Sequence, residues 1–383
     1  MAVVAALLIA VVVVQNAVVA QFAEVRPDRA RAAWPGNPKA ELWSGLTAIA
    51  AATRAGNQVE DSTLASLMDA ARKDPLAATP FLVRGIRARL AGEEALAGDA
   101  FAAAEQRDGR SVPARYFLAD HDLRTGDAAH GLAEISVLAR LIPNGVRGLA
   151  PFVANYAQDR RNWPQLRAVF RSNPSLGDEA LRVLASDAGN ADLILRLAPA
   201  QRQSQALWPG QLVQTLVGAG EYGKAKRVWA QVNGVDGSAD GLVYDPGFSE
   251  PKAPGPFNWS LTSSAVGLAE RQGGGHLHVL FYGQQDGVLA SQLLVLKAGR
   301  YRLKMQVMGD AGTPPALSWT VTCARASAPL VTATVTPKVD TSFVVPADCP
   351  AQRLELHGSA PELPHAFDVT MGAFSLTGGP PGA

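Results

Sequence analysis

The chain has 383 residues, which exceeds the size of one typical domain core and favours at least two domains. Lys and Arg (35) nearly balance Asp and Glu (34), so the net charge of +1 gives no field that would attract a nucleic acid. With 48% hydrophobic and 18% charged residues, the composition excludes a disordered chain and a polytopic membrane protein. The sequence therefore predicts a multidomain globular protein without a nucleic-acid partner.

The first twenty residues form an apolar segment without a charged side chain. A helix of that length nearly crosses a bilayer core about 30 Å thick, so residues 1–22 are predicted to be a membrane anchor or a signal segment. The apolar character resumes after Asn16 and no basic residue precedes the run, which favours an uncleaved single-pass anchor. Val18 and Ala20 fit the small-residue pattern of a signal-peptidase site, so a cleaved signal is the alternative.

Two observations on the compartment disagree. Arg26, Arg29 and Arg31 follow the apolar segment, which taken alone places the bulk of the chain on the inner side of the membrane. The only two cysteines, Cys323 and Cys349, stand at strand-like positions, and a disulfide between them fits an oxidising compartment. Two buried free thiols are the alternative. We predict an inner-membrane protein with its bulk in the periplasm, or one secreted to the periplasm after signal cleavage.

Residues 36–232 are predicted to form a helical domain. This stretch is rich in Ala, Leu and Arg, and its apolar residues recur at spacings of three and four between short Gly, Asp and Pro breaks. Because the connections are short, neighbouring helices are expected to be antiparallel. The clearest helices are expected at 39–54, 62–73, 79–91, 93–107, 111–125 and 127–141.

The helix breaks in this domain are periodic. Gly92, Gly126 and Arg160 lie 34 residues apart, each at a turn between two predicted helices, and 34 residues is the tetratricopeptide spacing. The small and aromatic positions of the first unit are Phe81, Gly85, Ala97, Phe101 and Ala104. The chain therefore resembles tetratricopeptide-repeat proteins, although the pattern weakens between 155 and 200. The resemblance implies a curved solenoid that binds peptides or proteins on its concave face and carries no catalytic residues.

The composition changes after the helices. Residues 233–256 form a Gly- and Pro-rich linker that leads into the last domain, and residues 257–378 alternate β-branched or aromatic residues with polar ones in short runs. Nine strands in this stretch indicate an antiparallel β-sandwich. They are expected at 258–262, 276–282, 291–296, 300–308, 317–323, 331–335, 342–345, 353–357 and 366–376.

The start of this domain carries a short motif. Gly247, Phe248 and Glu250, with Trp259 downstream, take the places of a Gly-Phe-x-Glu turn and a Trp that close one end of a jelly roll in carbohydrate-binding modules and related galactose-binding-like domains. The domain resembles those families, and the resemblance implies a jelly-roll sandwich. Because the fold is shared by many proteins that bind no sugar, it indicates the architecture better than the ligand.

The residue sets that chemistry requires are absent from the sequence. There is no G-x-x-x-x-G-K-[ST], G-x-S-x-G, H-E-x-x-H or C-x-x-C pattern, so no catalytic site, cofactor or metal is expected. The run 273–275 precedes a strand and is interpreted as a hairpin turn. His276 and His278 share a strand face at a spacing that suits a metal, and His357 could approach from another strand, but no third ligand is evident and an exposed polar face explains all three.

Alternation along the strands assigns nine polar residues to one sheet face. They are His276, His278, Tyr282, Arg302, Lys304, Gln306, Arg353, Glu355 and His357. Within this set His276, His278, Tyr282, Arg302, Lys304, Glu355 and His357 are the candidate glycan-binding residues. The alternative is a solvated face without a ligand, because antiparallel sheets normally turn one polar side to water.

These features together predict a non-enzymatic, membrane-tethered scaffold or adaptor of the bacterial envelope. Its repeats would bind a protein partner and its sandwich a glycan, for example in polysaccharide assembly or export. The first alternative is a purely structural assembly factor with no small ligand. The second is a glycoside-active enzyme whose two carboxylates come from distant strands and therefore leave no local motif.

Overall fold

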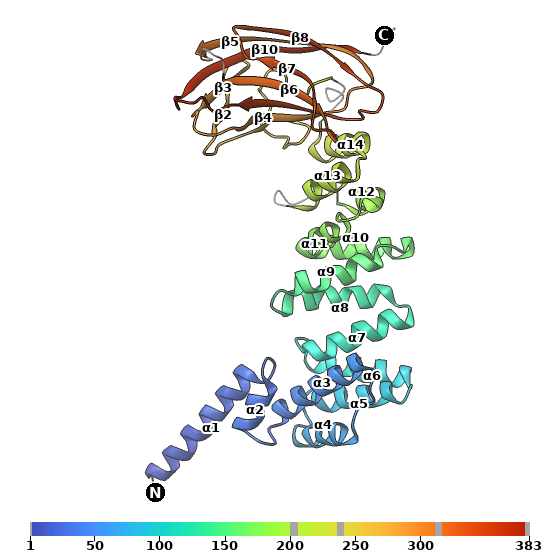
Figure 1. Ribbon diagram of the computed structural model, residues 1–383. Coiled ribbons are helices and arrows are strands. Elements are labelled where there is room, and N and C mark those ends of the chain that lie inside the picture. The colour runs from blue at the N-terminus through green and yellow to red at the C-terminus, as the bar shows by residue number, and fades with distance from the viewer. Residues whose placement is uncertain (1, 200–205, 236–240, 311–315, 380–383) are drawn as a thin grey trace. The chain divides into compact units, whose positions relative to one another are not determined.

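The computed structural model describes residues 2–199, 206–235, 241–310 and 316–379 and shows a multidomain α + β protein (Figure 1). Within these residues there are fourteen α-helices and two five-stranded antiparallel sheets. Parts of the predicted helical domain, linker and sandwich fall at 200–205, 236–240 and 311–315, outside the described residues. The chain divides into two compact units, one formed by Met1–Leu184 with Asp192–Ala206 and the other by Ala185–Ala191 with Leu207–Ala383.

The helical region begins with twelve helices. They are α1 (Ala2–Phe22), α2 (Pro27–Ala33), α3 (Pro38–Ala55), α4 (Asp61–Lys73), α5 (Thr79–Leu90), α6 (Glu94–Arg107), α7 (Val112–Thr125), α8 (Ala128–Leu141), α9 (Gly145–Tyr156), α10 (Trp163–Ser172), α11 (Pro174–Leu184) and α12 (Ala191–Leu197). Local caps set several boundaries: the Ser111 hydroxyl accepts from the Ala114 N–H, and the Asp127 carboxylate accepts from the His130 N–H. Gly126, at φ +93°, ends α7. Helices α3 to α8 match the six predicted ranges closely.

Small residues let the helices of a hairpin approach each other. A Cβ built on Gly85 of α5 would lie 2.4 Å from the Cε1 atom of Phe101 on α6, and Phe101 itself is fully buried. The other buried positions of α6 are all alanine: Ala97, Ala100 and Ala104. The predicted helical packing is therefore present, while the membership of these helices in the tetratricopeptide family stays a prediction.

The predicted membrane segment forms helix α1, but among the described residues no helix is both long and apolar enough to cross a membrane. The predicted membrane-spanning helix is therefore not supported. The second half of α1 packs on protein. Val19 is buried together with Ala30 and Ala40, and the Gln15 Nε2 donates to the Ala33 carbonyl at 3.1 Å.

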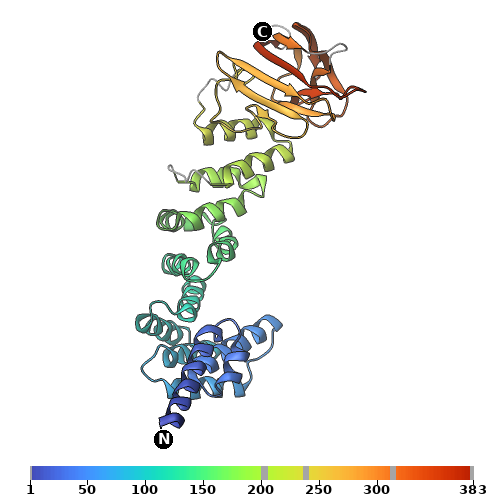
Figure 2. The same cartoon turned by 90° about the vertical axis from the view of Figure 1, so that its left-hand side faces the viewer.

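The second unit holds helices α13 (Trp208–Ala219) and α14 (Tyr222–Asn233) and a ten-stranded sandwich. The strands are β1 (Ser260–Leu261), β2 (Gly267–Gln272), β3 (His276–Phe281), β4 (Gly287–Leu294), β5 (Gly299–Asp310), β6 (Leu317–Cys323), β7 (Pro329–Thr334), β8 (Lys338–Val345), β9 (Gln352–Gly358) and β10 (Phe367–Gly379). One sheet, here sheet A, has the order β1-β4-β9-β6-β7, and sheet B has the order β2-β3-β10-β5-β8. Figure 2 shows the two sheets packed face to face. Each predicted strand overlaps an observed one, and β2 is additional.

Aromatic side chains fill the space between the two sheets. Trp259 and Trp319 lie 5.8 Å apart between ring centroids, and Phe374 packs edge-on against both. Phe248 stands 5.0 Å from Trp259, whose Nε1 donates to the Asp245 carbonyl at 2.9 Å. The turn and tryptophan that were predicted to close one end of the sandwich thus pack against each other in its core.

Helix α14 is packed as part of the sandwich unit. Its Trp229 is 1% exposed, and the indole Nε1 donates to the Pro254 carbonyl at 2.7 Å. The ring also contacts Tyr244 and Phe257 at centroid distances of 5.0 and 5.8 Å. The second compact unit therefore begins upstream of the linker predicted at 233–256.

Candidate binding surfaces of the sandwich

The nine polar residues assigned to one face by alternation belong to two sheets. Sheet B carries His276, His278, Arg302, Lys304 and Gln306, with Tyr282 directly after β3, whereas sheet A carries Arg353, Glu355 and His357. The outer faces of two stacked sheets point in opposite directions, so the predicted single face is in fact two faces. Alternation along a strand separates inside from outside, but it does not say which sheet the strand joins.

His278 on sheet B contacts two carboxylates on the neighbouring strands. When protonated, its ring donates from Nδ1 to the Glu270 Oε1 at 3.2 Å and from Nε2 to the Asp368 Oδ1 at 2.9 Å. Partial burial acts to lower the pKa of His278, but the hydrogen bonds that the ring donates to the two carboxylates outweigh it and raise the pKa above its usual 6.5. The ring therefore joins β2, β3 and β10 across the outer face.

His276 lies beside His278, at the end of the hairpin between β2 and β3. Its Nδ1 is 3.3 Å from the Gly273 carbonyl, and the run 273–275 forms the predicted hairpin turn. A Cβ built on Gly372 of the neighbouring strand β10 would lie 2.6 Å from the His276 Cδ2 atom. The imidazole therefore lies over the bare backbone of Gly372, a position that a larger side chain would occupy.

Strands β5 and β8 continue this face with charged side chains. The Arg302 guanidinium forms a bidentate pair with Asp340, at 2.6 Å from Nε to Oδ1 and 2.8 Å from Nη2 to Oδ2. The Arg302 hydrogen bonds lower the pKa of the Asp340 carboxyl. Lys304 stands opposite Asp340 in the strand register and is exposed. The outer face of sheet B thus carries two polar clusters, one around His278 and one around Arg302.

The outer face of sheet A is richer in hydroxyl groups. Glu355 is 20% exposed and stands in register between Ser291 of β4 and Thr320 of β6. The His357 Nε2 lies 3.2 Å from its Oε2, and this hydrogen bond lowers the pKa of Glu355 although burial opposes it. The Thr320 hydroxyl is buried and has no hydrogen-bond partner among the described residues. This face thus carries a partly exposed carboxylate in register with a threonine whose hydroxyl is buried.

Neither face offers an exposed aromatic ring within the described part of the sandwich. Tyr282 and Tyr244 are half-buried, and the other aromatic rings from Phe248 onward are buried. Tyr301 and Trp319 are among the buried ones, as their alternation predicts. Any ligand of these faces would therefore be held by hydrogen bonds and ion pairs rather than by a ring stacked on an exposed aromatic platform.

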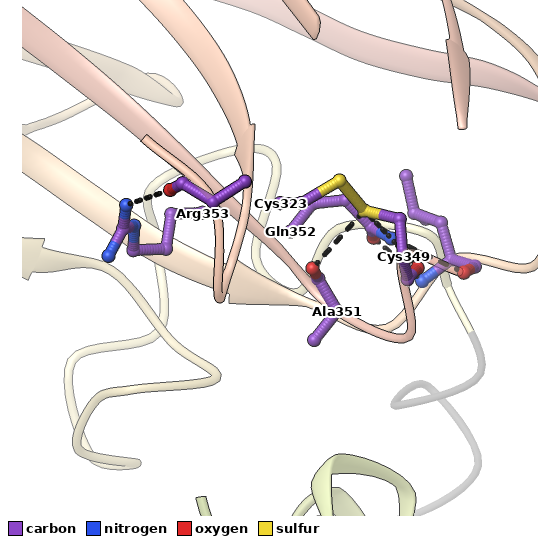
Figure 3. The surroundings of a disulfide bond; sticks show 7 residues. Cys323, Cys349, Ala351, Gln352 and Arg353 are labelled. Atoms are coloured by element: carbon purple, nitrogen blue, oxygen red, sulfur yellow. Dashed lines mark hydrogen bonds between the residues drawn. A yellow bond between two sulfur atoms is a disulfide. The ribbon is translucent and has the colours of Figure 1, made fainter. Parts of the chain in front are cut away.

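The two cysteines form a disulfide that joins the end of β6 to the loop before β9 (Figure 3). The Cα atoms of Cys323 and Cys349 are 5.5 Å apart. The fully buried Gln352 supports the bridge, because its Nε2 donates to the Cys349 carbonyl at 2.8 Å and its Oε1 accepts from the Leu296 N–H at 3.0 Å. The predicted pairing is therefore present, in place of two free thiols.

Metal binding finds no support in the described residues, which contain no group of three or more His, Cys, Asp or Glu side chains able to hold an ion. His276 and His278 lie on sheet B, whereas His357 lies on sheet A and cannot complete their set.

Sequence reasoning missed Glu270 and Asp368, the partners of His278. Asp368 alternates outward on a predicted strand, but Glu270 lies on β2, a strand without a sequence signal.

No family model matches the chain, and no curated protein matches it. Solved structures give partial likenesses. A chain from a crystal structure of accessory secretory proteins 1, 2 and 3 of Streptococcus pneumoniae is 14% identical, with a TM-score of 0.24. The matched region covers 30% of this chain and 88% of that chain. A carbohydrate-binding module of family 4 is 11% identical, with a TM-score of 0.28 and coverages of 36% and 99%. A family 61 module in complex with β-1,4-galactotriose is 14% identical, with a TM-score of 0.22 and coverages of 36% and 97%.

Proposed function

We propose that the chain is a non-enzymatic scaffold whose helical unit binds a protein partner. The observation that carries this proposal is a pair of exposed aromatic side chains on helices of the array. Tyr116 on α7 is 58% exposed and Phe152 on α9 is 46% exposed. Aromatic residues are enriched at protein interfaces and among the residues that contribute most to binding.

The helices that carry these rings are held together by ion pairs. Arg115 of α7 pairs with Glu105 of α6 and with Glu134 of α8, both at 2.6 Å, and its side chain is only 12% exposed. A partly buried guanidinium with two carboxylate partners fixes three consecutive helices relative to each other. A rigid support of this kind lowers the entropy cost when a partner binds.

Site-specific photo-crosslinking in the native cell tests this role. A photoreactive residue replaces Tyr116 or Phe152 in the full chain, and Val344 on β8, which is 55% exposed, serves as the matched control. We expect the two helical positions to cross-link to the same protein and the control position not to. Labelling of different proteins at the two helical positions, or equal labelling from Val344, would contradict the scaffold role.

We further propose that the protein resides in the periplasm, attached to the inner membrane through α1. The Cys323–Cys349 bridge supports an oxidising compartment. Val11 to Val14 of α1 are 46–61% exposed, which supports contact between this apolar stretch and a lipid surface. Thiol labelling with and without reductant tests the compartment, and flotation with lipid vesicles tests the attachment. Free thiols in cells, or no flotation that depends on α1, would remove these assignments.

A second candidate function is glycan binding by the outer face of sheet B. It is supported by four polar side chains of one sheet: His276 and His278 on β3, and Arg302 and Lys304 on β5, with β10 between the two strands. The lack of an exposed ring in the described part of this face favours instead the purely structural assembly factor. A glycan array with the full chain separates the two. If this face binds a glycan, Lys304→Gln should weaken the binding and the sheet A control Thr332→Ala should not, whereas an empty array would support the structural role.

A further inference from the structure

An open groove with a volume of about 720 Å³ lies among helices α4, α5 and α6 of the first unit. Its floor includes Val83, which is buried, and its walls include the exposed Met68 and the half-buried Leu96. A concave surface with an apolar floor is the usual shape of a site that receives a side chain from a ligand. We refer to this surface as the α4–α6 groove.

Three arginines line the α4–α6 groove, and their partners are few. Arg84 and Arg87, one turn apart on α5, are exposed and form no ion pair within the described residues. Arg72 of α4 uses its Nε to donate to the Met68 carbonyl at 3.4 Å. Among the described lining residues Glu93 is the only carboxylate, so the groove carries an excess of positive charge.

Other arginines of the same unit are differently placed. Arg89 pairs with Asp120 at 2.7 Å, and Arg115 and Arg124 each contact two carboxylates. These three arginines therefore have carboxylate partners on the helices, whereas Arg84 and Arg87 have no such partner in the described residues and lie beside an apolar floor. A guanidinium binds a carboxylate through two parallel hydrogen bonds, so the charge of the groove is complementary to an acidic ligand.

We propose that the α4–α6 groove binds an acidic segment of a partner protein. Carboxylates of the segment pair with Arg84 and Arg87, and an apolar side chain between them packs on Val83, Met68 and Leu96. A simple anion uses the arginines but not the apolar floor, whereas an acidic peptide that also carries apolar residues uses both. The proposal rests on the scaffold function proposed above and names the chemistry of the partner.

Fluorescence anisotropy with the full chain tests the groove directly. The probe is a short fluorescein-labelled peptide of alternating Glu and Leu, and its Gln/Leu and Lys/Leu counterparts are the comparison probes. We expect the acidic probe to bind more tightly than either, and binding to weaken as salt is raised. The double variant Arg84→Gln/Arg87→Gln should weaken binding by about tenfold or more. Equal affinity for the Glu and Gln probes would overturn the proposal.

Two further variants separate the groove from general surface charge. Arg140→Gln/Arg171→Gln removes two exposed arginines outside the groove and should leave the affinity unchanged. Arg84→Glu/Arg87→Glu should instead favour the Lys/Leu probe, because the charge of the groove is reversed. If the control pair weakens acidic binding as much as the groove pair does, the groove is not the site.

The remaining outcomes distinguish a failure of the groove from a failure of the scaffold role. If a partner cross-linked through Tyr116 or Phe152 binds the Arg84→Gln/Arg87→Gln variant as tightly as the unaltered chain, the groove assignment is wrong and the scaffold role stands. If no partner is cross-linked while peptide binding still depends on the two arginines, the scaffold role fails and the groove stands. Arginine-dependent binding to phosphatidylglycerol vesicles without peptide binding would make the occupant a lipid and overturn the proposal.

Discussion

The helical unit and the sandwich are stabilised in different ways. The buried positions of α6 are three alanines around Phe101, and its neighbour α5 approaches through Gly85. The sandwich instead buries large rings such as Trp319 and Tyr301, at 0 and 2% exposure. Close approach of backbones thus stabilises the first unit, and apolar volume between two sheets stabilises the second.

Polar contacts show the same contrast. In the helical unit Glu94 of α6 binds Arg124 and His121 of α7, at 2.8 and 3.2 Å, and Arg124 in turn binds Asp120. These pairs lie within one helix or join consecutive helices of the chain. In the sandwich His278 and Asp368 meet across 90 residues of sequence, because β3 and β10 are neighbours in sheet B. The helical unit therefore depends on local contacts and the sandwich on distant ones.

The largest effect is expected for Trp229→Ala. Removal of a fully buried indole should destabilise the second unit by about 3–5 kcal/mol, because a cavity opens and the hydrogen bond to Pro254 is lost. Hydrogen exchange followed by mass spectrometry measures the free energy of unfolding of each unit separately. Protection should fall in both α14 and the strands, with α5 to α8 unchanged. A loss confined to α13 and α14 would instead place the unit boundary at the predicted linker.

A slightly smaller effect is expected when the disulfide is removed. Cys323 and Cys349 are 26 residues apart, and closing a loop of that size restricts the unfolded chain enough to stabilise the native state by about 3–4 kcal/mol. The variant Cys323→Ala/Cys349→Ala should lower the stability of the sandwich by that amount in urea unfolding. The stability of the helical unit should not change. A loss below about 1 kcal/mol would mean that Gln352 and the surrounding core hold this loop without the bridge.

In the helical unit the comparable test is Gly85→Ala. The added Cβ would overlap the Phe101 ring, so we expect a loss of about 1–3 kcal/mol. Gly148→Ala on α9 is the matched control, because a Cβ there meets no atom within 4 Å and should stabilise the helix by about 0.5–1 kcal/mol. Thermal unfolding followed by circular dichroism measures both variants. If Gly85→Ala stabilised the protein as much as Gly148→Ala does, the packing of α5 and α6 would not depend on this close approach.

The same contrast explains which elements could be predicted from the sequence. The helices from α3 to α8 follow from local periodicity and from breaks such as Gly92 and Gly126, both at positive φ. Strand β2, with the sequence GLAERQ, has neither alternation nor β-branched residues and becomes a strand because it pairs with β3. The role of α14 depends on contacts between Trp229 and residues 15 to 28 positions later, which no local pattern reports.

The candidate surfaces show the same limit. Alternation along the strands correctly predicted that His276 and His278 face outward and that Trp319 faces inward, because the direction of a side chain depends only on the pleat of its strand. It also grouped Glu355 with His278, which sit on opposite sheets, since sheet membership is set by pairing between distant strands. The arginine-lined groove was missed for a related reason: the sequence does not show that Arg84 and Arg87 lie beside the apolar residues of α4 and α6.

The smallest effect is expected for the distant contact of His278. Its pKa is raised in the folded protein, so its stabilising contribution is fully present below 6.5 and is lost as the pH rises through the raised value. Because Glu270 and Asp368 are more than half exposed, solvent keeps the contribution within about 1 kcal/mol. His278→Gln should therefore destabilise the sandwich at about pH 5.5 more than at about pH 9 in urea unfolding. His276→Gln, on the same strand but with no carboxylate partner in the described residues, is the comparison variant for loss of an imidazole from this face. A pH-independent His278→Gln effect would mean that packing rather than charge joins β2, β3 and β10.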